Sequence, residues 1–325
     1  MKRTTIALLA ALGCAAAVTA CSPGSTANSG NAATPAGKNV SLVLGVSGSP
    51  FYEAVACGAK DAAARLGLTL DVSAGPQFAA DAQVPVVNAV TAKRPAGAAV
   101  VPTDAQALIA PLRQLKNAGT KVITVDQTLA DPSLPASQVI TDNKAGGAMA
   151  ADELDQLIGG RGKVLAITQP PGSTAQDQRV EGFEAKLKTY PGIEYLGAQY
   201  QSDDPQKAAQ IVTATLSAHP DLAAIFSTND QGAIGAVTGL DQAGAAGRVK
   251  MVAYDAATAE VNAFKNGKIQ ALIAQNPRQE GEVAMQTLKT LLDGGTVQPE
   301  IDTDLVTIKP GENAKADQYE YKAGC

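Results

Sequence analysis

The stretch at residues 223–255, AAIFSTNDQGAIGAVTGLDQAGAAGRVKMVAYD, decides the fold of this chain. It contains a short apolar run at 223–227, a longer segment at 231–243 and a second short apolar run at 250–253. Short, nearly continuous apolar runs are typical of strands buried on both faces of a parallel sheet, and the longer segment has the length of a helix. The stretch is therefore predicted to form one strand–helix–strand unit.

The same alternation continues on both sides of this unit. Further strands are predicted at 40–46, 68–72, 98–101, 121–125, 139–141, 163–168, 193–200 and 270–274. Further helices are predicted at 51–66, 80–92, 105–118, 144–158, 175–188, 205–218, 256–265 and 278–292. Alternation repeated this often favours parallel sheets covered by helices on both faces, and a body of about 285 residues is large for one core. We therefore expect an α/β protein with two doubly wound lobes.

The N-terminus has the pattern of a secretory signal. Two basic residues follow Met1, and an uncharged run of 17 residues ends at Ala20, directly before Cys21. A charged start, a short apolar segment and small residues before a cleavage point are typical of a signal peptide. We predict that residues 1–20 are removed and that Cys21, which follows a lipobox-like sequence, carries a lipid.

Two alternatives to this interpretation remain open. A transmembrane anchor would need about 20 apolar residues, more than this run provides. Cys14 is a second candidate for lipidation, although the residues before it fit the small-residue pattern less well. Residues 21–38 are rich in Ser, Gly, Asn, Ala, Thr and Pro, a composition typical of a flexible linker. The expected protein is extracytoplasmic and anchored to the cell membrane through lipidated Cys21.

Composition excludes several kinds of partner. The formal net charge is −5, and it becomes more negative when the two basic residues of the signal are removed. No basic patch favours nucleic acid. Aromatic residues make up 4% of the chain and Trp is absent, which argues against a large aromatic protein interface. We expect a monomer.

Two cysteines remain after the signal and the lipid site are set aside. Cys57 and Cys325 form an even pair in an oxidising compartment, which favours a disulfide. We predict that this bond joins the C-terminal tail to the first helix of the body. Two unpaired thiols are the alternative.

Polar and aromatic residues follow the predicted strands at the positions where open α/β sheets bind ligands. These residues are Ser47, Ser49, Phe51, Tyr52, Asp126, Gln127, Gln169, Asp177, Asn229, Asp230, Asp255 and Gln275. Carboxylates and amides exchange hydrogen bonds with hydroxyl groups, and aromatic faces cover the C–H face of a sugar ring. Any one of the polar residues could instead cap the next helix. Six strand ends together are better explained by one shared site for a neutral polyhydroxy ligand.

Short motifs follow one another in a fixed order along the body. They are VS and PFY within 46–52, VITVD at 122–126, TDN at 141–143 with GG at 146–147, RVEGF at 179–183, HPD at 219–221, IFSTND at 225–230, VAYD at 252–255 and IAQNP at 273–277. In their order and spacing these motifs resemble the ribose- and galactose-type periplasmic sugar-binding proteins, also called type I solute-binding proteins. The resemblance extends from about Asn39 to Thr307.

The resemblance implies a sugar captured between two lobes and delivered to an ABC importer. The segments that cross between the lobes would lie near 141–143, 274–276 and 302–304. The N-terminal lobe would comprise 39–141 plus 276–303, the C-terminal lobe 142–275 plus 304–309, and the tail 310–325. By matching position, the residues implied to contact the ligand are Phe51, Tyr52, Asp126, Asn229, Asp255 and Gln275, with Ser47 and Ser49 in a loop shorter than that of the ribose type.

Two positions depart from the pattern of that family. Gln127 and Asp177 stand where its members often have arginine, whereas Arg179 matches a second, structural arginine. The expected pocket is consequently acidic, and a different sugar, a polyol or an amino-bearing ligand all remain open. No Asp-rich loop has the spacing of a calcium site, so no metal and no cofactor are expected.

Three other classes of function compete with sugar binding. An enzyme would need a nucleophile with a base, yet the only histidine, His219, lies in a turn at a predicted helix end, and no Gly-x-Ser-x-Gly motif is present. Asp126 with Asp255 could mimic a glycosidase pair, but sugar-binding proteins present acids similarly. We expect no enzyme.

A ligand sensor for a membrane receptor, of the quorum or chemotaxis type, stays open because it shares the fold. A transcription regulator would carry an N-terminal DNA-binding motif instead of a signal.

Overall fold

The structure is a computed structural model that describes residues 37–322 and Cys325. The predicted signal at 1–20, the predicted lipid site Cys21 and the predicted linker as far as residue 36 lie outside the described residues. Within the described part, none of the helices has the length and apolar character that crossing a bilayer requires.

The N-terminal lobe contains one six-stranded sheet and four helices. Its strands are β1 (Asn39–Leu44), β2 (Thr69–Ala74), β3 (Gly97–Val100), β4 (Lys121–Val125), β5 (Gln138–Thr141) and β11 (Glu300–Thr303). Its helices are α1 (Pro50–Leu66), α2 (Ala80–Lys93), α3 (Ile109–Asn117) and α9 (Pro277–Leu292). The strand order is β11-β5-β4-β3-β1-β2, and all neighbouring strands are parallel.

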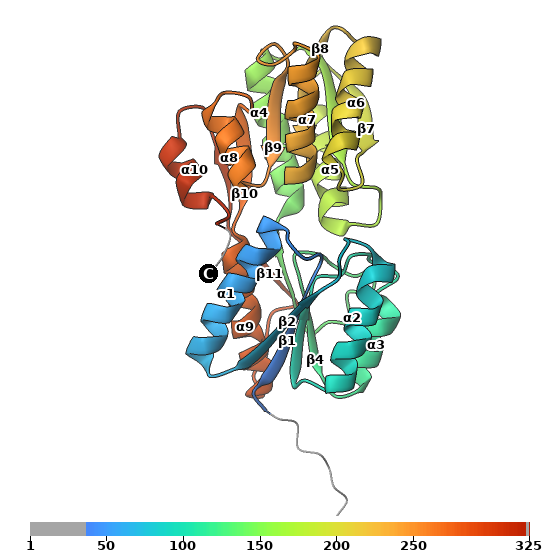
Figure 1. Cartoon of the computed structure of the whole chain (residues 1–325), viewed down its shortest axis with the longest axis vertical. Coiled ribbons are helices and arrows are strands. Elements are labelled where there is room, and N and C mark those ends of the chain that lie inside the picture. The colour runs from blue at the N-terminus through green and yellow to red at the C-terminus, as the bar shows by residue number, and fades with distance from the viewer. Residues whose placement is uncertain (1–36, 323–324) are drawn as a thin grey trace, which may run out of the picture. The chain divides into compact units, whose positions relative to one another are not determined.

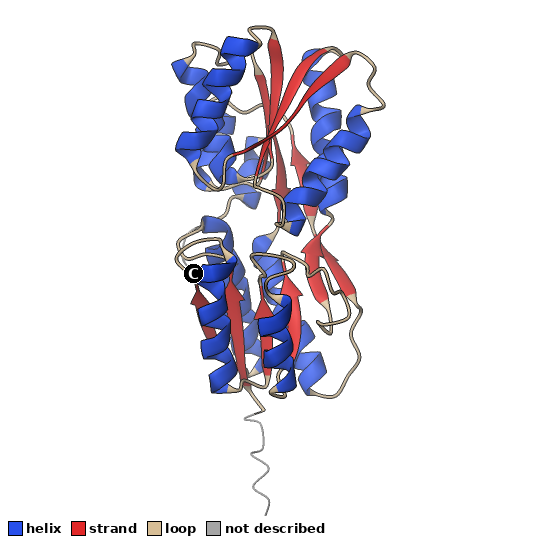
Figure 2. Cartoon of the chain, turned by 90° about the vertical axis from the view of Figure 1, so that its right-hand side faces the viewer, coloured by secondary structure: helices blue, strands red, loops and turns tan. Residues whose placement is uncertain are grey.

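Strand β1 shows why the apolar runs lack a polar face. Leu42 and Leu44 belong to the apolar cluster that includes α1 and α9, whereas Val43 between them packs with α2 and α3. Successive side chains of a strand point to opposite faces, so a sheet covered on both sides needs apolar residues at every position. Figure 2 shows the helices on both sides of the strands.

The C-terminal lobe has the same design. Its strands are β6 (Gly162–Thr168), β7 (Ile193–Tyr200), β8 (Leu222–Ser227), β9 (Lys250–Tyr254), β10 (Ala271–Gln275) and β12 (Leu305–Ile308). Its helices are α4 (Asn143–Ile158), α5 (Thr174–Leu187), α6 (Pro205–Ala218), α7 (Asp230–Gln242), α8 (Thr258–Lys265) and α10 (Asn313–Tyr319). The order is β12-β10-β9-β8-β6-β7, with β12 antiparallel to β10 and the other pairs parallel. The predicted fold class, two parallel-sheet α/β lobes, is confirmed.

The chain passes from one sheet to the other at three single residues, Asp142, Asn276 and Asp304. Two of them begin the helix that follows. The Asp142 side chain accepts a hydrogen bond from the backbone N–H of Ala145 (2.9 Å), and the Asn276 side chain accepts one from Gln279 (3.2 Å). Side-chain caps satisfy backbone donors at a helix start, so α4 and α9 begin directly where the chain leaves a sheet.

Helices α4 and α5 approach each other through two glycines. A Cβ atom on Gly147 would lie 2.0 Å from the carbonyl oxygen of Arg179, and one on Gly182 would lie 2.0 Å from that of Lys144. No other residue type fits at these separations. The close contact fixes the position of α5, which carries Arg179.

The structure differs from the predicted elements at two places. The helix predicted at 105–118 begins only at Ile109, because Asp104 Oδ1 accepts hydrogen bonds from the backbone N–H groups of Gln106 and Ala107 (both 2.8 Å) and holds a turn there. The predicted tail at 310–325 contains a helix, α10, that the sequence patterns do not predict. Figure 1 shows α10 beside α8, where its Ala316 is fully buried.

A disulfide joins Cys57 of α1 to Cys325, with 5.3 Å between the two Cα atoms. The C-terminal end of the chain consequently lies beside α1, as Figure 1 shows. The pairing expected from the cysteine count is present in the structure, and 268 positions of the sequence separate the two residues.

Candidate ligand site

A cavity lies where the carboxyl ends of strands from both sheets meet. In each sheet the second strand lies on one side of the first strand and the third strand lies on the other, so the strand order changes sides at β1 in one lobe and at β6 in the other. Ligands of open α/β sheets bind outside the carboxyl ends of strands at such switch points. The last residue of β10 and the segments that follow β1, β4, β6, β8 and β9 contribute residues to the cavity.

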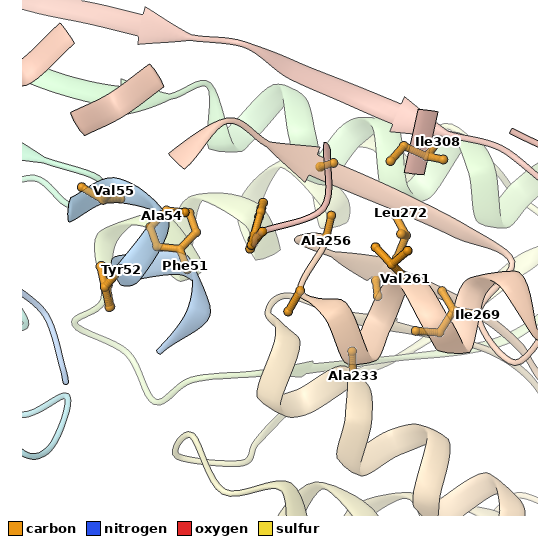
Figure 3. Packing of buried hydrophobic residues seen from close by; sticks show 14 of the residues in the cluster. Phe51, Tyr52, Ala54, Val55, Ala233, Ala256, Val261, Ile269, Leu272 and Ile308 are labelled. Carbon is orange, nitrogen blue, oxygen red and sulfur yellow. The ribbon is translucent and has the colours of Figure 1, made fainter. Parts of the chain in front are cut away.

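Aromatic side chains form the wall contributed by the N-terminal lobe. Phe51 and Tyr52, in the first turn of α1, lie edge to face with 5.2 Å between ring centroids, and Tyr52 is nearly parallel to Phe78 at 6.3 Å. Figure 3 shows Phe51 and Tyr52 side by side at the end of α1. The Tyr52 hydroxyl donates a hydrogen bond to Oδ2 of Asp126 (2.9 Å), so an acceptor is held next to the rings.

Three aspartates that line the cavity adopt left-handed backbone conformations. The φ angle is 62° at Asp126, 60° at Asp203 and 90° at Asp255. Positive φ is uncommon outside glycine, although aspartate tolerates it better than most residues. Such strain persists where the surrounding structure enforces it, and it concentrates at ligand sites.

Asn229 and Asp203 form part of the wall contributed by the C-terminal lobe. The Asn229 Nδ2 donates to Oδ1 of Asp203 (3.0 Å), which also accepts from Nε2 of Gln169 (2.9 Å). The Asn229 Oδ1 accepts from the backbone N–H of Gly232 (3.0 Å) and so caps α7. The capping interpretation therefore holds for Asn229, which lines the cavity at the same time.

Asp255 directly follows β9, Gln275 is the last residue of the neighbouring strand β10, and the two side chains are hydrogen-bonded to each other. The Gln275 Nε2 donates to Oδ1 of Asp255 (2.6 Å). The Gln275 side chain is only 1% exposed, and its Oε1 has no hydrogen-bond partner in the described part of the protein. A buried acceptor without a partner costs free energy, so this oxygen is a ready partner for a hydroxyl group in the cavity.

Arg179 supplies a guanidinium group to the cavity wall, although the sequence assigned it a structural role. Its Nε donates to Oδ1 of Asn143 and its Nη1 to the carbonyl oxygen of Thr228, both at 2.8 Å. The group lies 3.8 Å from the ring centroid of Tyr254. These contacts hold Arg179 in one orientation.

Burial raises the pKa of two carboxyl groups in the cavity. The pKa of Asp126 rises from 3.8 to about 6, mainly because the group is removed from water. The pKa of Asp230 rises to about 7 by the same cause, with the negative charges of Asp255 and Asp203 adding to it. A carboxyl group that holds its proton near neutral pH can donate a hydrogen bond as well as accept one. The cavity can thus serve both kinds of partner.

Most of the site residues predicted from sequence line this cavity. They are Ser49, Phe51, Tyr52, Asp126, Gln127, Gln169, Asn229, Asp230, Asp255 and Gln275. Gln127 additionally bridges the two lobes, because its Oε1 accepts from the backbone N–H of Ala175 (3.0 Å) and from the hydroxyl of Thr174 (3.1 Å) in α5.

Ser47 and Asp177, also predicted from sequence as site residues, are not among the residues that line the cavity. Ser47 is exposed, and its backbone N–H donates to the carbonyl oxygen of Gly75 (3.0 Å). Asp177 is also exposed and uses Oδ2 to accept from the backbone N–H of Gly172 (2.9 Å). The preceding residue, Gln176, lines the cavity instead, since one step along a helix rotates a side chain by about 100°.

Other lining residues were not predicted. Asp203 lies in the loop after β7, and the strand-end rule would have found it had it been applied to the predicted strand at 193–200. Phe78 follows β2 in a loop with no distinguishing pattern. Within residues 37–322 and Cys325, no group of three or more His, Cys, Asp or Glu side chains is arranged to hold a metal ion.

Comparison with known proteins identifies the family to which the chain is similar. Residues 40–296 match the family described as periplasmic binding protein domain. The chain is 30% identical over 269 residues to the ribose import binding protein of Salmonella typhimurium, covering 83% of this chain and 90% of that protein. It is 28% identical over 323 residues to the D-ribose/D-allose-binding protein of Pseudomonas aeruginosa, covering 96% and 98%.

Solved structures agree with the sequence relatives. An ABC transporter solute-binding protein from Agrobacterium vitis, bound with α-D-tagatopyranose, superposes with a TM-score of 0.86 at 33% identity, covering 88% of this chain and 99% of that one. A second solute-binding protein from the same organism, with bound D-fucose, gives 0.83 at 26% identity, covering 87% and 100%. The chain belongs to the periplasmic binding protein domain family, whose members are extracytoplasmic solute-binding proteins and not enzymes.

Proposed function

We propose that this protein captures a monosaccharide or a related polyol in the cavity and delivers it, as a monomer, to an ABC importer. One observation carries the proposal: hydrogen-bonding groups from both lobes, such as Asp126 from one and Asp255 from the other, line the same cavity. Relatives named for ribose and allose, and structures with bound tagatose and fucose, support a sugar as the ligand.

The proposed contacts divide by chemistry. The rings of Phe51 and Tyr52 would cover the C–H face of a pyranose or furanose, because sugars present one less polar face. Carboxylates and amides would exchange hydrogen bonds with hydroxyl groups, and bonds to charged groups are the stronger ones. The proposed polar contacts are Ser49, Asp126, Gln127, Asn229, Asp255 and Gln275, to which we add Arg179 and Asp203.

The lobes, 39–141 plus 276–303 and 142–275 plus 304–309, would move about the three crossing residues. A ligand that touches both lobes binds the closed form better than the open one, and its differential affinity shifts the population toward closure. The closed form would then dock on the permease.

Isothermal titration with D-ribose, D-allose, D-tagatose and D-fucose tests the site. At least one of these sugars should bind saturably, and Asp126→Asn should weaken that binding by about tenfold or more, because a charged acceptor is lost. Asp177→Asn is the matched control and should bind like the wild type, since Asp177 lies outside the cavity. Failure of these sugars, of polyols and of amino sugars to bind, or equal losses in the two variants, would contradict the proposal.

We also propose that the chain is anchored by a lipid on Cys21 after removal of residues 1–20. Support comes from the lipobox-like sequence and from the extracytoplasmic family. Cells fed labelled palmitate should incorporate label into the wild-type protein and into Cys14→Ser, whereas Cys21→Ser should remain unlabelled. If Cys21→Ser still incorporates label, the lipid is attached to another residue.

A further inference from the structure

The C-terminal tail, residues 310–325, is attached to both lobes. Its helix α10 packs against α8 of the C-terminal lobe through buried Ala316 and an ion pair between Lys265 and Asp317. Its last residue, Cys325, is bonded to Cys57 of α1 in the N-terminal lobe. The tail therefore adds a connection between the lobes beyond the three crossing residues.

Tyr321 lies between these two attachments and directly beside the cavity wall. Its backbone N–H donates to the carbonyl oxygen of Ala256 (2.9 Å), so its main chain runs along the segment that follows Asp255. Its side chain is 3% exposed, and its ring lies edge to face with Phe51 at 5.7 Å. Phe51 and Ala256 belong to one apolar cluster, part of which Figure 3 shows.

The hydroxyl of Tyr321 donates to Oδ1 of Asp255 (3.1 Å). The amide of Gln275 donates to the same oxygen (2.6 Å), and Oδ2 receives no hydrogen bond from the residues that the structure describes. Two donors on one oxygen fix the rotation of a carboxylate, and they leave its second oxygen as an acceptor. Because Asp255 lines the cavity, that acceptor is available to a ligand hydroxyl.

We propose that Tyr321 is a positioning residue of the ligand site and that the Cys57–Cys325 disulfide keeps it in place. The expected effect on sugar affinity rests on the proposed function, whereas the contact between Tyr321 and Asp255 does not. The tail thus belongs to the site, although it is the part of the chain farthest in sequence from Phe51 and Tyr52.

A measurement without any sugar tests the contact. The chain has seven tyrosines, so 13C labelling at the ring carbon that bears the hydroxyl gives a short, assignable set of NMR signals. The Tyr321 signal, assigned by its loss in Tyr321→Phe, should shift in Asp255→Asn. Asp255→Asn should no longer shift the Tyr321 signal when the disulfide is absent, whether it is removed by Cys325→Ser or by reduction of the folded protein. An unchanged response without the disulfide would overturn its holding role.

A second measurement uses the tightest-binding sugar of D-ribose, D-allose, D-tagatose and D-fucose, together with its monodeoxy forms. Tyr321→Phe keeps the ring against Phe51 and removes only the hydroxyl, so we expect a Kd about tenfold higher with little change in thermal stability. Tyr319→Phe is the matched control in the same tail, because the Tyr319 hydroxyl makes no hydrogen bond within the described residues.

The deoxy series separates positioning from general weakening. Removing one particular hydroxyl of the sugar should weaken binding less in Tyr321→Phe than in the wild type, because the Asp255 oxygen that accepts from this hydroxyl is already misplaced in the variant. Removing any other hydroxyl should weaken binding equally in both proteins. Cys325→Ser should reproduce this pattern, and the double variant should bind no worse than either single one. If Tyr321→Phe lowers the affinity for every deoxy form by the same factor as for the parent sugar, the positioning role is overturned. If neither these four sugars nor polyols or amino sugars bind the wild type, the proposed function fails, and the tyrosine signals alone decide this inference.

Discussion

Asn229 uses both ends of one amide group. Its oxygen caps α7 by accepting from the Gly232 N–H, and its nitrogen holds Asp203 in the cavity wall. Capping and ligand contact compete as explanations of a polar residue after a strand, yet a side chain with a donor and an acceptor can fill both roles. At the level of the single residue, position after a strand indicates the neighbourhood of the site but not the partner of each atom.

The buried carboxyl groups predict how stability depends on pH. The folded protein raises the pKa of Asp126 from 3.8 to about 6 and that of Asp230 to about 7, chiefly by burial. Because the folded state holds these protons more tightly than the unfolded chain, the stabilisation is complete below about pH 4 and is lost as pH rises through 6 and 7. The midpoint of thermal unfolding of the sugar-free protein should fall between pH 5 and pH 8.

Asp126→Asn should make that fall smaller, because the variant lacks one of the carboxyl groups whose pKa is raised in the folded protein. Asp71→Asn, a substitution on the surface where Asp71 pairs with Lys93, should leave the profile unchanged. A midpoint that rises from pH 5 to pH 8 in the wild type would contradict the assignment of the two groups.

At the scale of elements, helix α5 decides which side chains reach the cavity. Its start is bonded to Gln127 of the other lobe, and its body is pressed against α4 through Gly147 and Gly182. This placement turns Gln176 toward the cavity and leaves Asp177 exposed. The rotation of this helix about its axis follows from its packing contacts with other elements.

Gly182→Ala tests this packing. The added methyl group would collide with the carbonyl oxygen of Lys144 at 2.0 Å, so α5 must move away from α4. We expect a loss of about 2 kcal/mol of stability in urea unfolding, together with weaker sugar binding, since Arg179 moves with the helix. Glu181→Ala, one residue away and exposed, should stay within about 0.5 kcal/mol of the wild type. Equal stability of the two variants would show that α5 does not need the close contact.

At the scale of the molecule, the three crossing residues and the disulfide-bonded tail connect lobes that share one cavity. Because a ligand bonded to both lobes favours the closed form, saturating sugar should lower the radius of gyration measured by X-ray scattering. At the same sugar concentration, Asp126→Asn should show a smaller decrease in the radius of gyration. The full decrease should return when more sugar is added. If no sugar that binds makes the wild-type protein more compact, closure about the crossing residues is wrong.

Local sequence patterns suffice to predict the fold class and many of the residues that line the cavity. Alternating apolar runs and amphipathic segments are local patterns, and a strand buried on both faces requires them, so each segment indicates its own structure. The carboxyl end of each strand is also fixed locally. The order of residues along the chain therefore suffices to assign Asp126, Asn229 and Asp255 to the edges of the sheets that line the cavity.

Packing between distant segments, in contrast, decides which side chains line the cavity. Gln176 lines the cavity in place of Asp177 because α4 sets the rotation of α5, and Asp203 joins the wall through its bonds to Asn229 and Gln169. Tyr321 reaches Asp255 across 66 positions of sequence, held by contacts of α10 and by the disulfide. Contacts between distant segments depend on how whole elements pack, and no local pattern of residues encodes them.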